Sequence, residues 1–253
     1  MPIYCDPENK SFTLTTQDTM YQMQIGPVGH LLHLYYGPKT DCCFDYLQPD
    51  RDCGFSPNPY DWQQGRGWSL DTKAQEYSSA HTGDYRVSSL RLKTDAGICG
   101  TDLRYVSHAI REEKYQIPGM PSAFDKTGSA CCLSITLKDA ATGVLVELLY
   151  GVFEAENVIT RAVRVINAGD SVVMLEQAAS ACLDIPFGSW QLIHFHGRHT
   201  MERMPERRDL IQGIQTISST RGATSHQHNP FVILCQPETT EDYGECYGMM
   251  LVY

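Results

Sequence analysis

Three groups of histidines supply side chains from which a metal or catalytic site could be built. His30 and His33 lie three apart in GHLLHLYYG, an expected strand, so their side chains would point to opposite faces and would not act as a pair. The string His226-Gln227-His228-Asn229 stands directly before an apolar run. Each of its side chains can bond backbone groups that an irregular turn leaves unpaired. A structural corner ahead of a core strand is therefore favoured there over a metal site.

The third group begins with His194-Phe195-His196 and continues to His199. An H-x-H unit on a strand points both rings to one face, which is the geometry of two metal ligands. The spacing partly matches the metal motif of the cupin family, but Glu202 lies one residue too far along and no second cupin motif follows. A strand of mixed polarity leading into a loop is favoured here, and we expect no metal and no cofactor.

Nucleophilic and phosphate chemistry lack their usual signatures in this sequence. The patterns GxSxG, GxxxxGK[ST] and GxGxxG do not occur. Among many carboxylates, Asp52 differs because it lies in DRDCGFSPNP, where Pro57 and Pro59 stiffen a loop tip. A stiff loop can hold an acid ready to accept hydrogen bonds from sugar hydroxyls. Asp52 is therefore a candidate binding residue.

The net charge of the 253-residue chain is −10, with 42% apolar and 20% charged residues. This composition is typical of a globular protein rather than a disordered one. Nucleic-acid binding depends on clustered cations that neutralise phosphates, so nucleic acid is not expected as a partner, and neither is an anionic membrane surface. Neutral sugars and amphiphiles remain possible ligands.

The ten cysteines do not follow a disulfide or zinc pattern. Cys42-Cys43 and Cys131-Cys132 are adjacent, no CxxC spacing occurs, and several other cysteines stand within apolar runs. The N-terminus MPIYCDPENK has no basic and apolar leader, and no apolar run approaches the ~18 residues of a membrane span. We therefore predict free thiols and a cytoplasmic location.

Alternation of apolar and polar residues with a period of two dominates the chain and predicts many short strands. The runs 144–153 and 172–185 are among the expected strands, and turn signals such as Gly-Pro, Lys-Asp-Ala-Ala-Thr-Gly and Asn-Ala-Gly-Asp separate the strands. The one weak helix candidate is 108–117, and the long irregular segment 48–83 is expected to be an ordered, packed excursion. This pattern predicts an all-β protein, a large antiparallel β-sandwich, with residues 1–253 as one domain. Because the expected strand ECYGMMLVY runs to the last residue, the chain is expected to be a fragment of a longer protein.

Several segments resemble, in order and over nearly the whole chain, the N-terminal region of bacterial α-galactosidases of glycoside hydrolase family 36. They are DRDCGFSPNP, AQEYSSAHTGDYR, TDLRYVSHAI, GVFEAENVITRAVRVINAGD, GRHTMERMPERR, GIQTISSTRGATSHQHNPFVIL and GECYGMMLVY. The resemblance implies a β-supersandwich of galactose-mutarotase-like fold in front of a catalytic (β/α)8 barrel. The catalytic pair of that barrel, two aspartates about 5–5.5 Å apart in a retaining mechanism, would lie beyond Tyr253.

The same resemblance implies two substrate contacts in this chain. An acid in the loop before FSPNP reaches the sugar pocket in the family, and the matching residue is Asp52. An aromatic residue within a G-x-x-x-x-E-R segment makes the second contact, and the matching residue is His199, where many members have Trp. A histidine ring is flat and adds a hydrogen-bonding nitrogen, but it has less area to stack on a sugar. By this resemblance the SHQHNPF string is a structural corner remote from the chemistry.

Two functions from different classes follow from these observations. The favoured one is a non-catalytic domain of a tetrameric α-galactosidase that acts on melibiose- or raffinose-type sugars. In this interpretation the domain contributes to oligomer assembly and to the walls of a substrate pocket, which is expected to be that of a neighbouring subunit. The alternative is a free-standing β-sandwich module that binds carbohydrate, or a metal through its histidines. The chain alone is expected to be catalytically inactive in either case.

Overall fold

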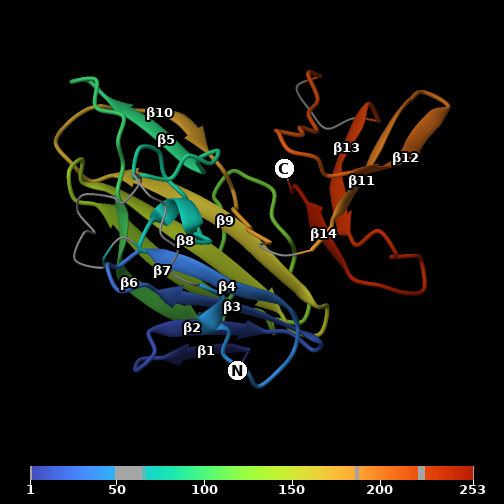
Figure 1. The fold of residues 1–253 in the computed structure, drawn as a ribbon, viewed down its shortest axis with the longest axis horizontal. Coiled ribbons are helices and arrows are strands. Elements are labelled where there is room, and N and C mark those ends of the chain that lie inside the picture. The colour runs from blue at the N-terminus through green and yellow to red at the C-terminus, as the bar shows by residue number, and fades with distance from the viewer. Residues whose placement is uncertain (1, 49–64, 66, 186–187, 222–225, 253) are drawn as a thin grey trace. The chain divides into compact units, whose positions relative to one another are not determined.

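The fold is described from a computed structural model that covers residues 2–48, 65, 67–185, 188–221 and 226–252. These residues form fourteen strands and two short 3-10 turns, η1 (Asp45–Leu47) and η3 (Leu70–Thr72), and the described part of the chain contains no α-helix (Figure 1). The chain divides into two compact units. Unit 1 comprises Met1–Gln116 and Phe124–Asp184, and unit 2 comprises Ile117–Ala123 and Ile185–Tyr253. The single-domain interpretation of residues 1–253 stays a prediction.

Unit 1 contains two four-stranded antiparallel sheets and one two-stranded sheet (Figure 1). The first sheet has its strands in sequence order, β1 (Ile3–Asp6), β2 (Ser11–Thr15), β3 (Thr19–Ile25) and β4 (Leu31–Pro38). The second is also in sequence order, β6 (Leu103–Arg111), β7 (Cys131–Asp139), β8 (Val144–Phe153) and β9 (Val158–Asn167). The two-stranded sheet pairs β5 (Leu90–Thr94) with β10 (Val173–Ala178).

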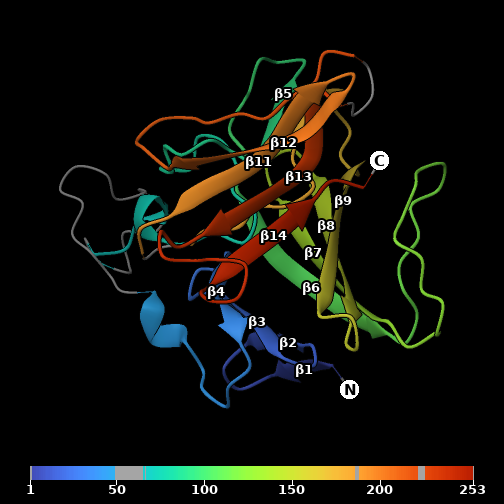
Figure 2. The same ribbon diagram turned by 90° about the vertical axis from the view of Figure 1, so that its right-hand side faces the viewer.

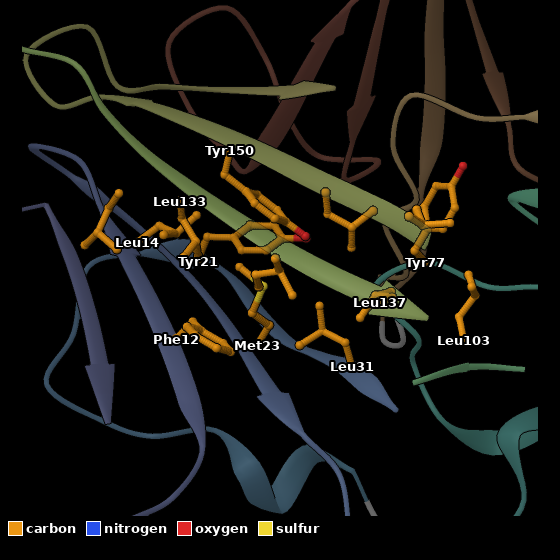
Figure 3. Close-up of a cluster of buried hydrophobic side chains, with 14 of the residues drawn as sticks. Phe12, Leu14, Tyr21, Met23, Leu31, Tyr77, Leu103, Leu133, Leu137 and Tyr150 are labelled. Carbon is orange, nitrogen blue, oxygen red and sulfur yellow. The ribbon is translucent and has the colours of Figure 1, made fainter. Parts of the chain in front are cut away.

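The period-two pattern of the sequence places alternate side chains of these strands in one core. On β7 the buried side chains include Leu133 and Ile135, and on β8 they include Val146 and Leu148. The first sheet contributes to the same cluster from its own strands, for example through Phe12. Figure 3 shows this cluster, in which Tyr21 of β3 and Tyr150 of β8 lie next to each other. Burying a large apolar side chain contributes about 1.5–3 kcal/mol, so the alternation itself stabilises a sandwich.

A tight turn joins β7 to β8, as the sequence Lys-Asp-Ala-Ala-Thr-Gly predicts. The carboxylate of Asp139 accepts hydrogen bonds from the backbone N (3.0 Å) and the hydroxyl (2.5 Å) of Thr142. Gly143 has a φ of +74°, a conformation in which L side chains are strained. The side-chain bonds and the glycine together fix the register of this hairpin.

Unit 2 is built around one four-stranded antiparallel sheet with the order β12-β11-β13-β14 (Figure 2). Its strands are β11 (Gln191–Arg198), β12 (Met201–Asp209), β13 (His228–Cys235) and β14 (Cys246–Met250). A two-residue turn joins β11 to β12, whereas β13 arrives from a long connection and inserts between β11 and β14. The sheet thus brings residues together that are about thirty positions apart in the sequence.

The structure corrects two of the sequence-based expectations. The helix candidate at 108–117 is wrong, because its first residues belong to strand β6, which ends at Arg111. His108 and Ile110 pair with Ile135 and Leu133 across the β6–β7 ladder, and this pairing outweighs the weak helical pattern. The expected strand at 172–185 is shorter, since β10 covers only Val173–Ala178.

Two further findings concern burial and the cysteines. In the excursion at 48–83, Trp68 and Tyr77 are buried, as expected of a packed segment, whereas Phe55, Tyr60 and Trp62 lie outside the described residues. The cysteines of the described ranges are all free thiols, and Cys53 lies outside those ranges. No helix in the described part of the chain is long and apolar enough to span a membrane.

Candidate functional site

His199 lies at the tip of the β11–β12 hairpin, where its side chain is 92% exposed. The turn contains only His199 and Thr200, and Thr200 has a φ of +68°. Close backbone packing supports the turn, because a Cβ on Gly197 would lie 2.1 Å from the carbonyl oxygen of Met201. The glycine of the G-x-x-x-x-E-R segment is therefore required by geometry, and the hairpin presents the His199 ring to solvent.

Glu202 adds a carboxylate to the same tip. Its Oε1 accepts a hydrogen bond from the backbone N of Thr200 (2.8 Å) and lies 3.9 Å from Nδ1 of His199. The hydrogen bond from Thr200 lowers the pKa of Glu202, so this carboxylate stays ionised at neutral pH. The tip therefore offers an exposed ring beside a carboxylate, which suits hydrogen bonding to sugar hydroxyls.

The second predicted contact, Asp52, lies outside the described residues together with most of its loop. The residue that precedes the loop, Gln48, is held firmly. Its carbonyl oxygen accepts a hydrogen bond from Nζ of the buried Lys73 (2.8 Å), and its side chain bonds the backbone N (3.2 Å) and O (3.3 Å) of Ala74. The start of the Asp52 loop is thus anchored to unit 1.

Unit 2 gathers three histidines that sequence reasoning had placed in two separate groups. His194 and His196 share a face of β11, with ring centroids 5.9 Å apart, as the H-x-H spacing predicts. His228 of β13 pairs with His196 across the ladder and lies 6.0 Å from the His194 ring. Glu206 of β12 stands opposite His194. No signal in the sequence could show that β13 lies beside β11.

The carboxylate of Glu206 approaches two of these rings. Its Oε2 lies 3.3 Å from Nε2 of His194 and 3.7 Å from Nε2 of His196. Among the described residues, however, no group of three or more His, Cys, Asp or Glu side chains is arranged to hold a metal ion. Burial lowers the pKa of His194, and the nearby positive groups Arg208, His196 and His228 lower it further, while Glu206 raises it.

The histidine string before β13 forms a corner, as predicted, but it is close to the hairpin. His226 and Gln227 form a turn, and His228 begins β13. The carbonyl oxygen of Gln227 accepts a hydrogen bond from the backbone N of Gly197 (3.3 Å). The corner therefore supports the base of the turn that carries His199, and its distance from the chemistry stays a prediction.

His30 and His33 have separate partners, as their spacing predicts. Nε2 of His30 lies 2.8 Å from Oδ1 of Asp102, whereas Nδ1 of His33 lies 3.4 Å from Oε2 of Glu76. The two rings do not form a shared site.

Glu76 is the centre of a buried polar network that sequence reasoning missed. Its carboxylate is 0% exposed and accepts hydrogen bonds from the hydroxyls of Tyr21 (2.8 Å) and Tyr150 (2.7 Å). Nη2 of Arg161 lies 2.7 Å from the same carboxylate. Burial alone would raise the pKa of Glu76. The effects of Arg161, His33 and Tyr150 outweigh burial, so the pKa is lower than that of an ordinary glutamate. Because its oxygens are already occupied, Glu76 supports the core rather than a substrate.

Comparison with known proteins places this architecture in a family. A sequence profile for the glycosyl hydrolase family 36 N-terminal domain matches residues 29–253. The chain belongs to this family. It is 47% identical over its full length to a bifunctional alpha-galactosidase/sucrose kinase of Mediterraneibacter gnavus and 37% identical to alpha-galactosidase AgaA of Geobacillus stearothermophilus. It covers 27% and 35% of these two proteins, so the family 36 chain spans about a third of its relatives' length.

Solved structures agree with the sequence relationship. The galactosidase domain of the bifunctional AgaSK enzyme superimposes with a TM-score of 0.93 at 46% identity, over 97% of this chain and 34% of that one. A Geobacillus stearothermophilus AgaA variant in complex with raffinose gives a TM-score of 0.89 at 37% identity, over 94% of this chain and 33% of that one. The prediction of an antiparallel, all-β N-terminal domain of family 36 is confirmed.

Proposed function

We propose that the protein containing this chain hydrolyses terminal α-galactosyl residues from melibiose- or raffinose-type sugars, and that this chain is its non-catalytic N-terminal domain. The observation that carries the proposal is the 47% identity over the full chain to a bifunctional alpha-galactosidase/sucrose kinase. The raffinose complex of a 37% identical enzyme supports the choice of sugar. The catalytic pair would be supplied by chain outside these 253 residues.

Within this function, His199 and Asp52 are proposed to contact the substrate. The support for His199 is its position at a hairpin tip, its 92% exposure and the neighbouring carboxylate of Glu202. The support for Asp52 is its match to the family pattern and the firm anchoring of Gln48 just before its loop. Both side chains would accept or donate hydrogen bonds to sugar hydroxyls, and the His199 ring would also cover an apolar sugar face.

The assembly and the location of the protein belong to the same proposal. We expect a cytoplasmic homotetramer in which the domain reaches the pocket of a neighbouring subunit. Mixing an Asp52→Ala protein with a variant whose barrel is inactivated tests this arrangement. Hybrid tetramers should recover part of the activity, whereas no recovery after exchange of subunits would argue against contact between subunits.

A chromogenic α-galactoside assay tests the proposed activity. The whole protein should hydrolyse the substrate, and the purified 253-residue chain should give only the rate of a buffer control. An assay with a β-galactoside serves as the matched control, and neither sample should cleave it. The proposal fails if the whole protein does not hydrolyse α-galactosides, or if the 253-residue chain does so alone.

A further inference from the structure

Strands β11, β12 and β13 form the stem that supports the hairpin tip with His199, and this stem contains buried polar atoms without hydrogen bonds. His194 is 3% exposed, and both of its ring nitrogens are buried without a hydrogen bond, although Oε2 of Glu206 lies 3.3 Å from Nε2. Nδ1 of His228 and Nε of Arg208 are likewise buried without partners. A buried donor or acceptor that lacks a partner costs about 1–3 kcal/mol, so this part of the sheet is weakly stabilised even at neutral pH.

The charges around His194 are unbalanced. The titratable and charged groups that face it are His196 on its own strand, Glu206 and Arg208 on β12, and His228 on β13. A proton on His194 would place its positive charge near the guanidinium of Arg208, with Glu206 as the one carboxylate among these groups. That carboxylate is itself 45% exposed, so water screens much of its attraction.

We propose that this cluster makes the β11–β12–β13 sheet a proton-sensitive stem, which opens in mildly acidic solution while the sandwich of unit 1 stays closed. The proton enters on the buried imidazole of His194, and no bond between heavy atoms changes. The cost of burying this charge, together with repulsion from Arg208, then separates β11 from its neighbours. The tip that carries His199 loses its rigid support as a result.

The sign of the effect follows from the burial of His194. Its pKa in the folded chain is lowered below the value of about 6.5 that an unfolded histidine has. The unfolded or opened state therefore binds more protons near and below that pH. The stability of the stem is fully present above about pH 6.5 and is lost as the pH falls towards the lowered folded pKa. Each unit of difference in pKa changes the opening equilibrium by about tenfold.

Hydrogen exchange of the 253-residue chain at pH 7.5 and pH 5.0 tests this inference, with rates expressed as protection factors so that the intrinsic pH effect cancels. Amides of β11 and β13 should lose protection by about tenfold or more at pH 5.0. Amides of β7 and β8, two strands without histidine, should keep theirs. The inference is overturned if the stem stays protected at pH 5.0, or if β7 and β8 lose protection to the same extent.

Variants of the cluster separate proton binding from other causes of opening. His194→Leu removes the buried imidazole and should reduce the acid-induced loss, and His228→Asn should do so independently if the first variant fails to fold. Glu206→Gln removes the single carboxylate and should increase the loss. His199→Asn changes the exposed histidine of the same hairpin and should show the wild-type loss. If all four variants behave alike, the cluster is not the proton-sensitive element.

The exchange experiment does not depend on the proposed substrate. Only the consequence for His199 rests on the proposed function, and the pH dependence of KM in the whole protein measures it. If the stem opens at low pH but KM does not change, the inference of a proton-sensitive stem stands. His199 would then not belong to the substrate site. Failure of the galactosidase assay would likewise leave the exchange result unaffected.

Discussion

Unit 1 and unit 2 each bury a histidine beside a carboxylate, but the central buried groups of the two units, Glu76 and His194, differ in the hydrogen bonds that they make. In unit 1, Glu76 is enclosed and its oxygens accept hydrogen bonds from two tyrosines and face Arg161. In unit 2, His194 is equally buried, yet its nitrogens have no hydrogen-bond partner, and the carboxylate nearby is half exposed. Burial therefore does not by itself distinguish a structural polar group from a responsive one. The hydrogen bonds that each group makes distinguish the structural Glu76 from the responsive His194.

The largest expected effect comes from breaking the network of unit 1. Arg161→Met leaves the buried Glu76 carboxylate without its cation and should lower the free energy of unfolding by about 3–5 kcal/mol. Urea denaturation at pH 7.5 measures the change. Arg164→Met on the same strand is the matched control, because its pair with Glu147 is half exposed on the arginine side and should contribute about 1 kcal/mol or less. Equal effects of the two variants would contradict the contrast.

A smaller effect is expected for Tyr150→Phe, which removes one hydroxyl donor from Glu76. A hydrogen bond to a charged group contributes about 1.5–3 kcal/mol, and the free energy of unfolding should fall by that amount. Because the pKa of Glu76 is lowered in the folded chain, its contribution is present above the pKa of an unfolded glutamate and is lost only as the pH falls through the lowered value. Denaturation at pH 5.0 and pH 7.5 should therefore give the same difference between variant and wild type.

The hairpin of unit 2 provides the next test, through Gly197. An alanine Cβ would lie 2.1 Å from the carbonyl oxygen of Met201, so Gly197→Ala should cost about 1–3 kcal/mol in local stability. Hydrogen exchange of β11 and β12 measures it. Gly213→Ala is the control, because that glycine also has a positive φ (121°) but no atom lies within 4 Å of its Cβ position. If both variants weaken β11 and β12 alike, close packing of the turn is not the reason for the glycine.

The sequence predicts the strands of the sandwich well because local alternation determines them. The run 144–153 is expected as a strand and is β8, and the turn after Asp139 follows from its own residues. The sequence does not predict pairings between distant segments, since burial and register decide these only in the folded chain. Two such pairings are the proximity of His228 to His194 and the hydrogen-bonded network around Glu76.

In the candidate site, too, the sequence predicts some residues, whereas other features are seen only in the structure. The family pattern finds His199, and the structure adds that a two-residue turn exposes it. The pattern also finds Asp52, whose position lies outside the described residues. The partnerless nitrogens of His194 have no counterpart in the sequence, because they depend on what surrounds a side chain and not on which residue it is.

The smallest effect on stability should accompany the clearest effect on function. His199→Ala changes an exposed side chain, so the melting temperature of the chain should barely move, with a change in free energy below about 0.5 kcal/mol. Asp52→Ala should behave in the same way, because its loop is polar and stiffened by prolines. Thermal denaturation of the 253-residue chain checks both variants, and a large loss of stability would show that the changed residue supports the fold.

The kcat/KM of the whole protein for raffinose tests the central claim most directly, namely that this domain supplies substrate contacts through Asp52 and His199. A hydrogen bond accepted by a charged group is worth about 1.5–3 kcal/mol, so Asp52→Ala should lower kcat/KM by roughly tenfold to a hundredfold. His199→Ala should lower it by less, and His199→Trp should restore it by stacking. Unchanged kcat/KM in both alanine variants would contradict the account, because the domain would then support the enzyme without touching its sugar.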